Sequence, residues 1–82
     1  MSAKEMFEKL GYEYKNYDGY ICYEKETNNT THFIGFDNRA HTFNKYQMSD
    51  RFLSITLKEL QAINKQVEEL DWNEWRNKRN IR

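Results

Sequence analysis

The segment from Ser54 to Leu70 constrains the fold more than any other part of the chain, because it combines a helix start signal with helical periodicity. Thr56 and Glu59 have the spacing of a capping box, in which each side chain accepts a hydrogen bond from the backbone N–H of the other residue. Apolar residues then recur every three or four positions and fall on one helical face: Leu60, Ile63, Val67 and Leu70. We expect this face to join the core and the helix to lie across one face of a sheet.

The end of this long helix can be drawn in more than one way. A helix that stopped at Leu70 would end on two glutamates, which oppose the helix dipole, whereas one that continued to about Arg79 would end on basic residues. Asp71 could instead cap a separate helix. We favour a kink or restart near Asp71, which would turn Trp72 and Trp75 back towards the body of the protein.

A second, shorter helix is predicted at the start of the chain, from Ser2 to Leu10. Ser2 and Glu5 repeat the capping-box spacing, and Gly11 can end the helix with a positive φ. The apolar residues share one face: Ala3, Met6, Phe7 and Leu10. About two turns of helix are not stable alone in water, so this face must dock on the rest of the chain.

The residues between the two helices have the pattern of an antiparallel meander. Strands at 12–17 and 20–26 flank Asp18-Gly19, a strong two-residue hairpin turn, and further strands are expected at 31–36 and 41–46. Pairing around Asp18-Gly19 divides the first hairpin into an apolar face with Tyr12, Tyr14, Ile21 and Tyr23, and a second face with Lys15, Tyr17, Tyr20 and Cys22. We assign the first face to the core. The same pairing sets Glu13 opposite Glu24, which is mildly unfavourable and leaves a slipped register open.

These elements give an α+β fold in one domain that spans residues 1–82. Aromatic residues make up 16% of the chain, so a few large rings must supply much of the buried area. No apolar run is long enough to span a membrane, and the charged N-terminal segment does not have the pattern of a signal peptide. The single cysteine, Cys22, excludes an internal disulfide and fits a reducing cytoplasm.

The charges of the chain cancel overall but are unevenly distributed. Residues 76–82 carry +4 and no acid, so residues 1–75 carry −4. We interpret residues 76–82 as a basic, partly frayed tail that could contribute to a contact surface. Aromatic and basic residues that could bind a partner are Tyr17, Tyr20, Trp72, Trp75, Arg76, Lys78 and Arg79.

The sequence contains no recognisable arrangement for catalysis, metal binding or a cofactor. His32, His41 and Cys22 are the only soft metal ligands, and none lies in a ligand-spaced motif. The two histidines should lie near opposite ends of one hairpin, too far apart to share a zinc ion. No phosphate-binding glycine loop is present. We therefore expect a protein that is not an enzyme and that uses no metal or cofactor.

Several segments together resemble a family of small uncharacterised proteins that phages and prophages of low-GC Gram-positive bacteria encode. The segments are AKEMFEKLGY, the tyrosine-rich hairpin, IGFDNRAHTF and SITLKELQAINKQVEELDW. Members of the family often have Gly where Asp71 stands. The resemblance implies a phage accessory role in the bacterial cytoplasm, but the family has no established activity or site residues to transfer.

The function expected from these observations is binding of a host or phage macromolecule, including a role in modulating host defence. The face with Tyr17, Tyr20 and Cys22 would bind a protein or a second copy of the chain, since an uncovered apolar face often marks a contact site. One alternative is binding of nucleic acid through Tyr17, Tyr20 and the basic tail. Another is sequestration of a small nucleotide in an aromatic pocket. No membrane partner is expected.

Overall fold

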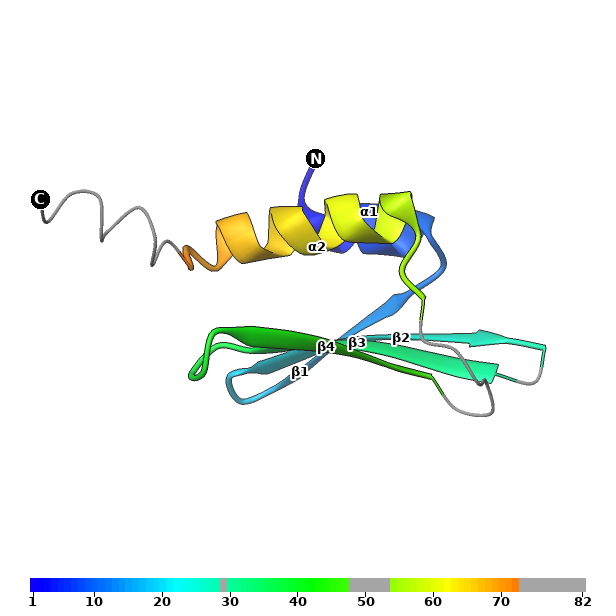
Figure 1. Cartoon of the computed structure of the whole chain (residues 1–82), viewed down its shortest axis with the longest axis horizontal. Coiled ribbons are helices and arrows are strands. Elements are labelled where there is room, and N and C mark those ends of the chain that lie inside the picture. Colours follow the sequence, from blue (N-terminus) through cyan, green and yellow to red (C-terminus); the bar gives the residue numbers. More distant parts are fainter. Residues whose placement is uncertain (29, 48–53, 73–82) are drawn as a thin grey trace, which may run out of the picture.

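The computed structural model describes residues 1–28, 30–47 and 54–72. The elements in chain order are α1 (Ala3–Lys9), β1 (Glu13–Tyr17), β2 (Tyr20–Thr27), β3 (Thr30–Asp37), β4 (Thr42–Gln47) and α2 (Leu57–Glu69). The strands form one antiparallel sheet in the order β1-β2-β3-β4, and both helices lie on the same side of it (Figure 1). The predicted α+β architecture with a four-stranded meander is confirmed.

Both helices begin at the predicted capping boxes. The Ser2 side chain accepts from the Glu5 N–H while Glu5 accepts from the Ser2 N–H, and Thr56 and Glu59 make the same exchange in α2. Gly11 follows α1 with a φ of 93°, a conformation that glycine adopts without steric cost. Local sequence therefore fixes both helix starts before any tertiary packing is considered.

The first hairpin has the register that its turn predicts. Asp18 and Gly19 both have positive φ, 47° and 92°, as a type I′ turn requires. Tyr17 pairs with Tyr20 beside this turn, and the register continues to the pair of Glu13 and Glu24 at the far end. The slipped register is therefore wrong, and the like-charged pair is accepted at an exposed position.

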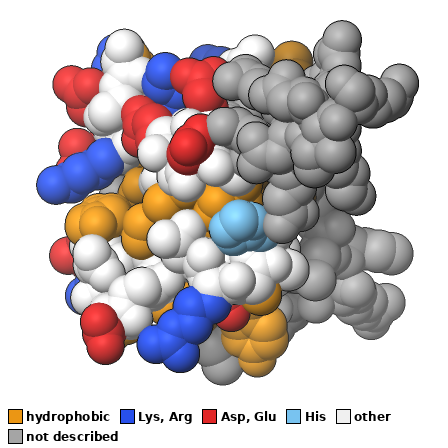
Figure 2. Space-filling view, turned by 90° about the vertical axis from the view of Figure 1, so that its left-hand side faces the viewer, with side chains coloured by type: hydrophobic (Ala, Val, Ile, Leu, Met, Phe, Trp, Pro, Cys, Tyr) orange, Lys and Arg blue, Asp and Glu red, His pale blue; other side chains and the backbone are white. Residues whose placement is uncertain are grey.

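The core lies between the helix layer and the sheet. The Phe7 ring of α1 stacks on Tyr23 of β2 with 4.0 Å between centroids, and Phe36 of β3 meets both rings edge-on. The fully buried cluster comprises Phe7, Tyr12, Tyr23, Ile34, Phe36, Ala62 and Ile63. At the end of the molecule with the two hairpin turns, hydrophobic side chains form a visible band between helices and sheet (Figure 2).

The buried face of α2 differs from the predicted stripe. Leu60 is 42% exposed, whereas the buried residues of the helix are Glu59, Ala62, Ile63 and Gln66. Ile63 is a core residue as predicted, Val67 and Leu70 only pack against the core, and the placement of Leu60 in the core is wrong. The helix is thus rotated so that two polar residues point towards the sheet.

Two buried tyrosines explain this rotation. The Tyr12 hydroxyl donates to Glu59 Oε2 at 2.7 Å, and the Tyr23 hydroxyl donates to Gln66 Oε1 at 2.5 Å. Lys45 of β4 donates to Glu59 Oε1 at 3.0 Å, in an ion pair whose side chains are 6% and 5% exposed. Because an unpaired buried hydroxyl or charge is costly, the helix presents acceptors rather than Leu60 at these positions.

The long helix ends where a break was predicted. Leu70 is its C-terminal cap, and Asp71 has a φ of 63°, which stops the helix. Trp72 turns back onto the body, where its indole N–H donates to Asn38 Oδ1 at 2.7 Å and its ring stacks on His41. The predicted position of Trp75 and the predicted tail, residues 76–82, lie outside the described residues.

Candidate functional site

The face of the sheet opposite the helices brings together two of the predicted binding residues, Tyr17 and Tyr20. We call it the outer face. Strand alternation and the observed register place these residues on it: Glu13, Lys15 and Tyr17 of β1, Tyr20, Cys22, Glu24 and Glu26 of β2, Thr31, Phe33, Gly35 and Asp37 of β3, and Thr42, Asn44 and Tyr46 of β4. No described element covers this face, as Figure 1 shows.

Tyr20 forms the floor of the outer face rather than projecting from it. A Cβ atom placed on Gly35 would lie 1.9 Å from the Tyr20 hydroxyl oxygen, so the ring lies directly over the glycine. Burial raises the pKa of this phenol, an effect that the nearby Asn44 side chain on β4 partly opposes. The ring thereby bridges β2, β3 and β4 as a fixed, flat platform.

Cys22 lies beside this platform and is only 6% exposed. It pairs with Lys15 on one side and with Gly35 on the other. Burial is the main cause that raises the pKa of its thiol, which keeps the sulfur protonated and poorly nucleophilic. Cys22 therefore serves as part of the apolar floor of the outer face, not as a reactive group.

Aromatic rings flank the floor. Tyr17 on β1 and Tyr46 on β4 are each 56% exposed, and the half-buried Phe33 lies beside Tyr46 with 5.9 Å between ring centroids. Sequence reasoning identified Tyr17 but missed Phe33 and Tyr46. Their signal was present, since Phe33 alternates with the core residue Ile34 and Tyr46 is opposite Phe33. Aromatic residues thus reach from one edge of the sheet to the other.

The outer face is acidic. It carries the carboxylates of Glu13, Glu24, Glu26 and Asp37 and the single ammonium group of Lys15. Lys15 lies 3.8 Å from Glu13, at an exposed position where an ion pair contributes little. The Tyr17 hydroxyl lies 3.5 Å from Glu24. A ligand of this face would meet negative charge around an aromatic centre.

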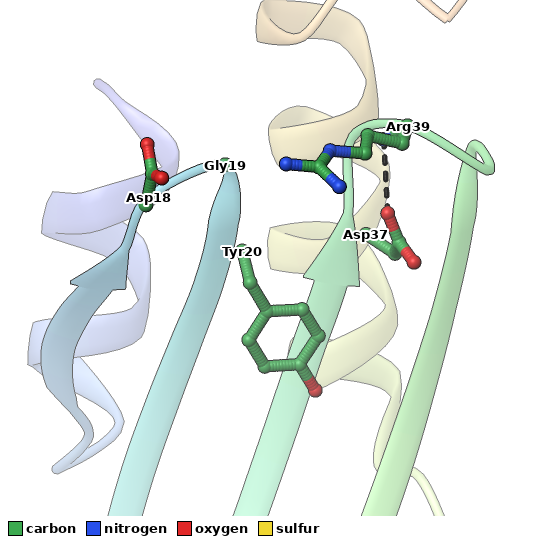
Figure 3. Close-up of a pocket in the computed structure, with 5 residues that line it drawn as sticks. All are labelled: Asp18, Gly19, Tyr20, Asp37 and Arg39. Carbon is green, nitrogen blue, oxygen red and sulfur yellow. Dashed lines mark hydrogen bonds between the residues drawn. The ribbon is translucent and has the colours of Figure 1, made fainter.

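A small pocket lies at the turn end of the outer face, with a volume of about 200 Å³ (Figure 3). Asp18, Gly19, Tyr20, Asp37 and Arg39 line it. Asp37 Oδ1 accepts from the backbone N–H groups of Arg39 and Ala40, which fixes the turn. The Arg39 guanidinium extends across the pocket towards Gly19. The volume is smaller than the roughly 300–1,000 Å³ of typical small-molecule sites.

The structure separates the remaining predicted site residues from Tyr17 and Tyr20. Trp72 packs on Phe36, whose side chain is on the helix side of the sheet, so it does not join the outer face. Trp75, Arg76, Lys78 and Arg79 lie outside the described residues.

The two histidines lie at opposite ends of the β3–β4 hairpin, as predicted. His32 pairs with Gln47, whereas His41 lies in the turn with a φ of 56°. Within residues 1–28, 30–47 and 54–72, no three potential metal ligands lie together. Neither described helix is long and apolar enough to cross a membrane.

Comparisons with known proteins give no relative: no family model, no curated protein and no solved structure matches this chain.

Proposed function

We propose that this chain is a non-enzymatic protein-binding module that recognises its partner through the outer face. The observation that carries the proposal is the uncovered sheet face, on which the exposed Tyr17 and Tyr46 and the half-buried Phe33 flank a fixed floor. Exposed aromatic residues on a rigid scaffold are typical protein-binding anchors, because they bury a large area and lose little conformational freedom. We extend the proposal, on the resemblance of the sequence to small phage and prophage proteins, to a phage accessory role in the bacterial cytoplasm that includes modulation of host defence.

The charge of the outer face supports a protein partner over nucleic acid. On the strands four carboxylates outnumber one ammonium group, and at the turn end Asp18 balances Arg39, so the face as a whole would repel a phosphate backbone. Tyr20, which would be an anchor for stacked bases, lies flat against Gly35. The complementary partner has an apolar patch with lysine or arginine around it, since matched charges steer association and reject wrong partners.

A symmetric dimer and a nucleotide-binding role have weaker support. Two outer faces packed against each other would set carboxylates against carboxylates, which opposes a symmetric dimer through this face. The pocket beside Tyr20, at about 200 Å³, is small for sequestration of a nucleotide.

Site-specific photocrosslinking in bacterial cells tests the proposal. A benzophenone amino acid at Tyr17 or Tyr46 should give one discrete protein adduct, and the same residue at Asn64, exposed on α2, should not. Adducts with nucleic acid, adducts equally abundant at Asn64, or none at either tyrosine would reject the proposal.

A further inference from the structure

A second candidate surface lies on the opposite side of the molecule, between the two helices. Helices α1 and α2 lie side by side in Figure 1, and at one end of the contact the Ala3 N–H donates to Glu69 Oε2 at 3.0 Å. Beside this contact the two helices border an open groove of about 210 Å³, lined by Met1, Met6, Lys9, Leu10, Lys58 and Gln61. None of these residues belongs to the outer face.

The floor and the rim of this groove have different chemistry. Met1 is 67% exposed, and Met6 and Leu10 are only partly buried, so apolar surface is accessible. Methionine side chains are flexible and polarizable, and they adapt to different apolar ligands. Lys9 and Lys58 lie at the rim, and neither forms an ion pair or a side-chain hydrogen bond with any residue that the structure describes.

The size of the groove indicates what it can hold. A volume of about 210 Å³ is below that of typical small-molecule sites but accepts one large apolar side chain. A groove between helices with such a floor is suited to the apolar face of a helical or extended segment. Neither rim cation is held in a close ion pair among the described residues, although Lys9 attracts Glu5 one turn earlier on α1, so carboxylates next to that side chain would complement both lysines.

We propose that this groove binds an acidic segment of another protein, which inserts one apolar side chain over Met6 and Leu10 and places carboxylates beside Lys9 and Lys58. The chain would then have two separate docking surfaces of opposite charge, the acidic outer face and this basic groove. A second copy related by a two-fold axis is a poor occupant, because it would bring two pairs of lysines together.

A display library of random twelve-residue peptides, selected on the folded full-length protein, tests this inference. Enriched peptides should share an apolar residue flanked by Asp or Glu. Their affinity should fall about tenfold or more for the double variant Lys9→Glu, Lys58→Glu. The matched control, Lys4→Glu with Lys65→Glu, makes the same charge change on the same two helices at positions that do not line the groove, and should lose less than about twofold. Circular dichroism checks that both variants are folded.

Three results would overturn the inference. The library could yield no ligand, it could yield no peptide in which Asp or Glu flanks an apolar residue, or such acidic peptides could bind equally well to both double variants. Basic peptides are expected from the acidic outer face and do not bear on the groove. Self-association that disappears only in Lys9→Glu, Lys58→Glu, measured by light scattering, would assign the groove to a second copy and also reject it. The crosslinks at Tyr17 should persist in this variant, so failure of the groove and failure of the outer-face proposal can be told apart.

Discussion

The two faces of the sheet use the same residue type in opposite ways. On the helix side, Tyr12 and Tyr23 are 3% and 1% exposed, and each hydroxyl has an acceptor on α2. On the outer face, Tyr17 and Tyr46 are each 56% exposed. The difference shows that a tyrosine in this small sheet is structural where a helix supplies both cover and an acceptor. Where no helix covers the tyrosine, its ring remains available to a partner.

This comparison makes the acceptors on α2 as important as the rings. Glu59 accepts from Tyr12, from Lys45 and from the Thr56 N–H, so it joins β4, the start of α2 and the segment after α1. A buried ion pair of this kind is weak evidence for net stability, but breaking it leaves an uncompensated charge. The packing of α2 on the helix side of the sheet therefore depends on the Glu59 carboxylate.

The largest expected effect comes from removing that carboxylate. Glu59→Ala leaves the buried Tyr12 hydroxyl without its acceptor. It also leaves the Lys45 ammonium without its counter-charge, with the Ser54 carbonyl as its remaining acceptor, so the free energy of unfolding should fall by about 3–5 kcal/mol. Urea denaturation measures the change, with Glu68→Ala, an exposed residue of the same helix, as the control. A loss below about 1 kcal/mol for Glu59→Ala would mean that the hydrogen bonds from Tyr12 and Lys45 to Glu59 do not stabilise the packing of α2 on the sheet.

The same carboxylate predicts a dependence on pH. Burial by itself would raise the pKa of Glu59, but hydrogen bonds from Tyr12, Thr56 and Lys45 hold it below its ordinary value of 4.5. A pKa that is lower in the folded chain adds stability above the unfolded value, and this stability is lost as the pH falls through the folded value. The destabilisation of Glu59→Gln should therefore be full near neutral pH and shrink below pH 4.5. A pH-independent difference would contradict this.

Sequence patterns were sufficient for elements that are specified locally. The capping boxes at Ser2 and Thr56 and the Asp18-Gly19 turn depend on residues at most three positions apart, and all three formed as predicted. The turn also fixed the register of the first hairpin, and with it the separation of Tyr17 from Tyr23 onto different faces. Period-two alternation then carried the assignment along each strand.

The face of α2 could not be predicted in the same way. Apolar periodicity favoured Leu60, but the rotation of the helix depends on hydroxyl groups 43 and 47 residues away in the sequence. The sequence of α2 alone suggests that Glu59 and Gln66 face solvent. Only the contacts of these residues with the Tyr12 and Tyr23 hydroxyls explain why this polar side of the helix is buried. The contact of the Tyr20 ring with Gly35 likewise could not be predicted without the register that pairs β2 with β3.

The next largest loss of stability is expected at the face of α2 that packs on the core, which includes Val67 but not Leu60. Val67→Ala should lower the free energy of unfolding by about 1–2 kcal/mol, because Val67 packs against the core, whereas Leu60→Ala should cost less than about 1 kcal/mol. Parallel thermal melts provide the comparison. A larger cost at Leu60 than at Val67 would restore the apolar stripe as the buried face.

A smaller effect is expected on the floor of the outer face. Gly35→Ala forces the Tyr20 ring off the sheet, and because the ring can swing into solvent the cost should be only about 1 kcal/mol. In a Tyr20→Ala background the same change should cost almost nothing, since no ring remains to displace. The double-mutant cycle therefore measures the coupling free energy between Tyr20 and Gly35. Additive effects of the two substitutions would show that the Tyr20 ring does not lie on Gly35.

The smallest effect on stability should come from substituting the exposed Tyr17 and Tyr46. It should differ most from the effect of substituting a buried tyrosine on the helix side of the sheet. Replacing Tyr17 and Tyr46 by Ser removes side chains that are more than half exposed, so the free energy of unfolding should change by less than about 0.5 kcal/mol for each. Tyr23→Ser should cost several times more, because it removes a stacked ring and leaves Gln66 without its donor. Binding should show the reverse order: a partner crosslinked through the outer face should lose affinity for the Tyr17→Ser, Tyr46→Ser protein while its fold is unchanged. If that double variant unfolds instead, the exposed rings contribute to the core, and the distinction between the two faces of the sheet is wrong.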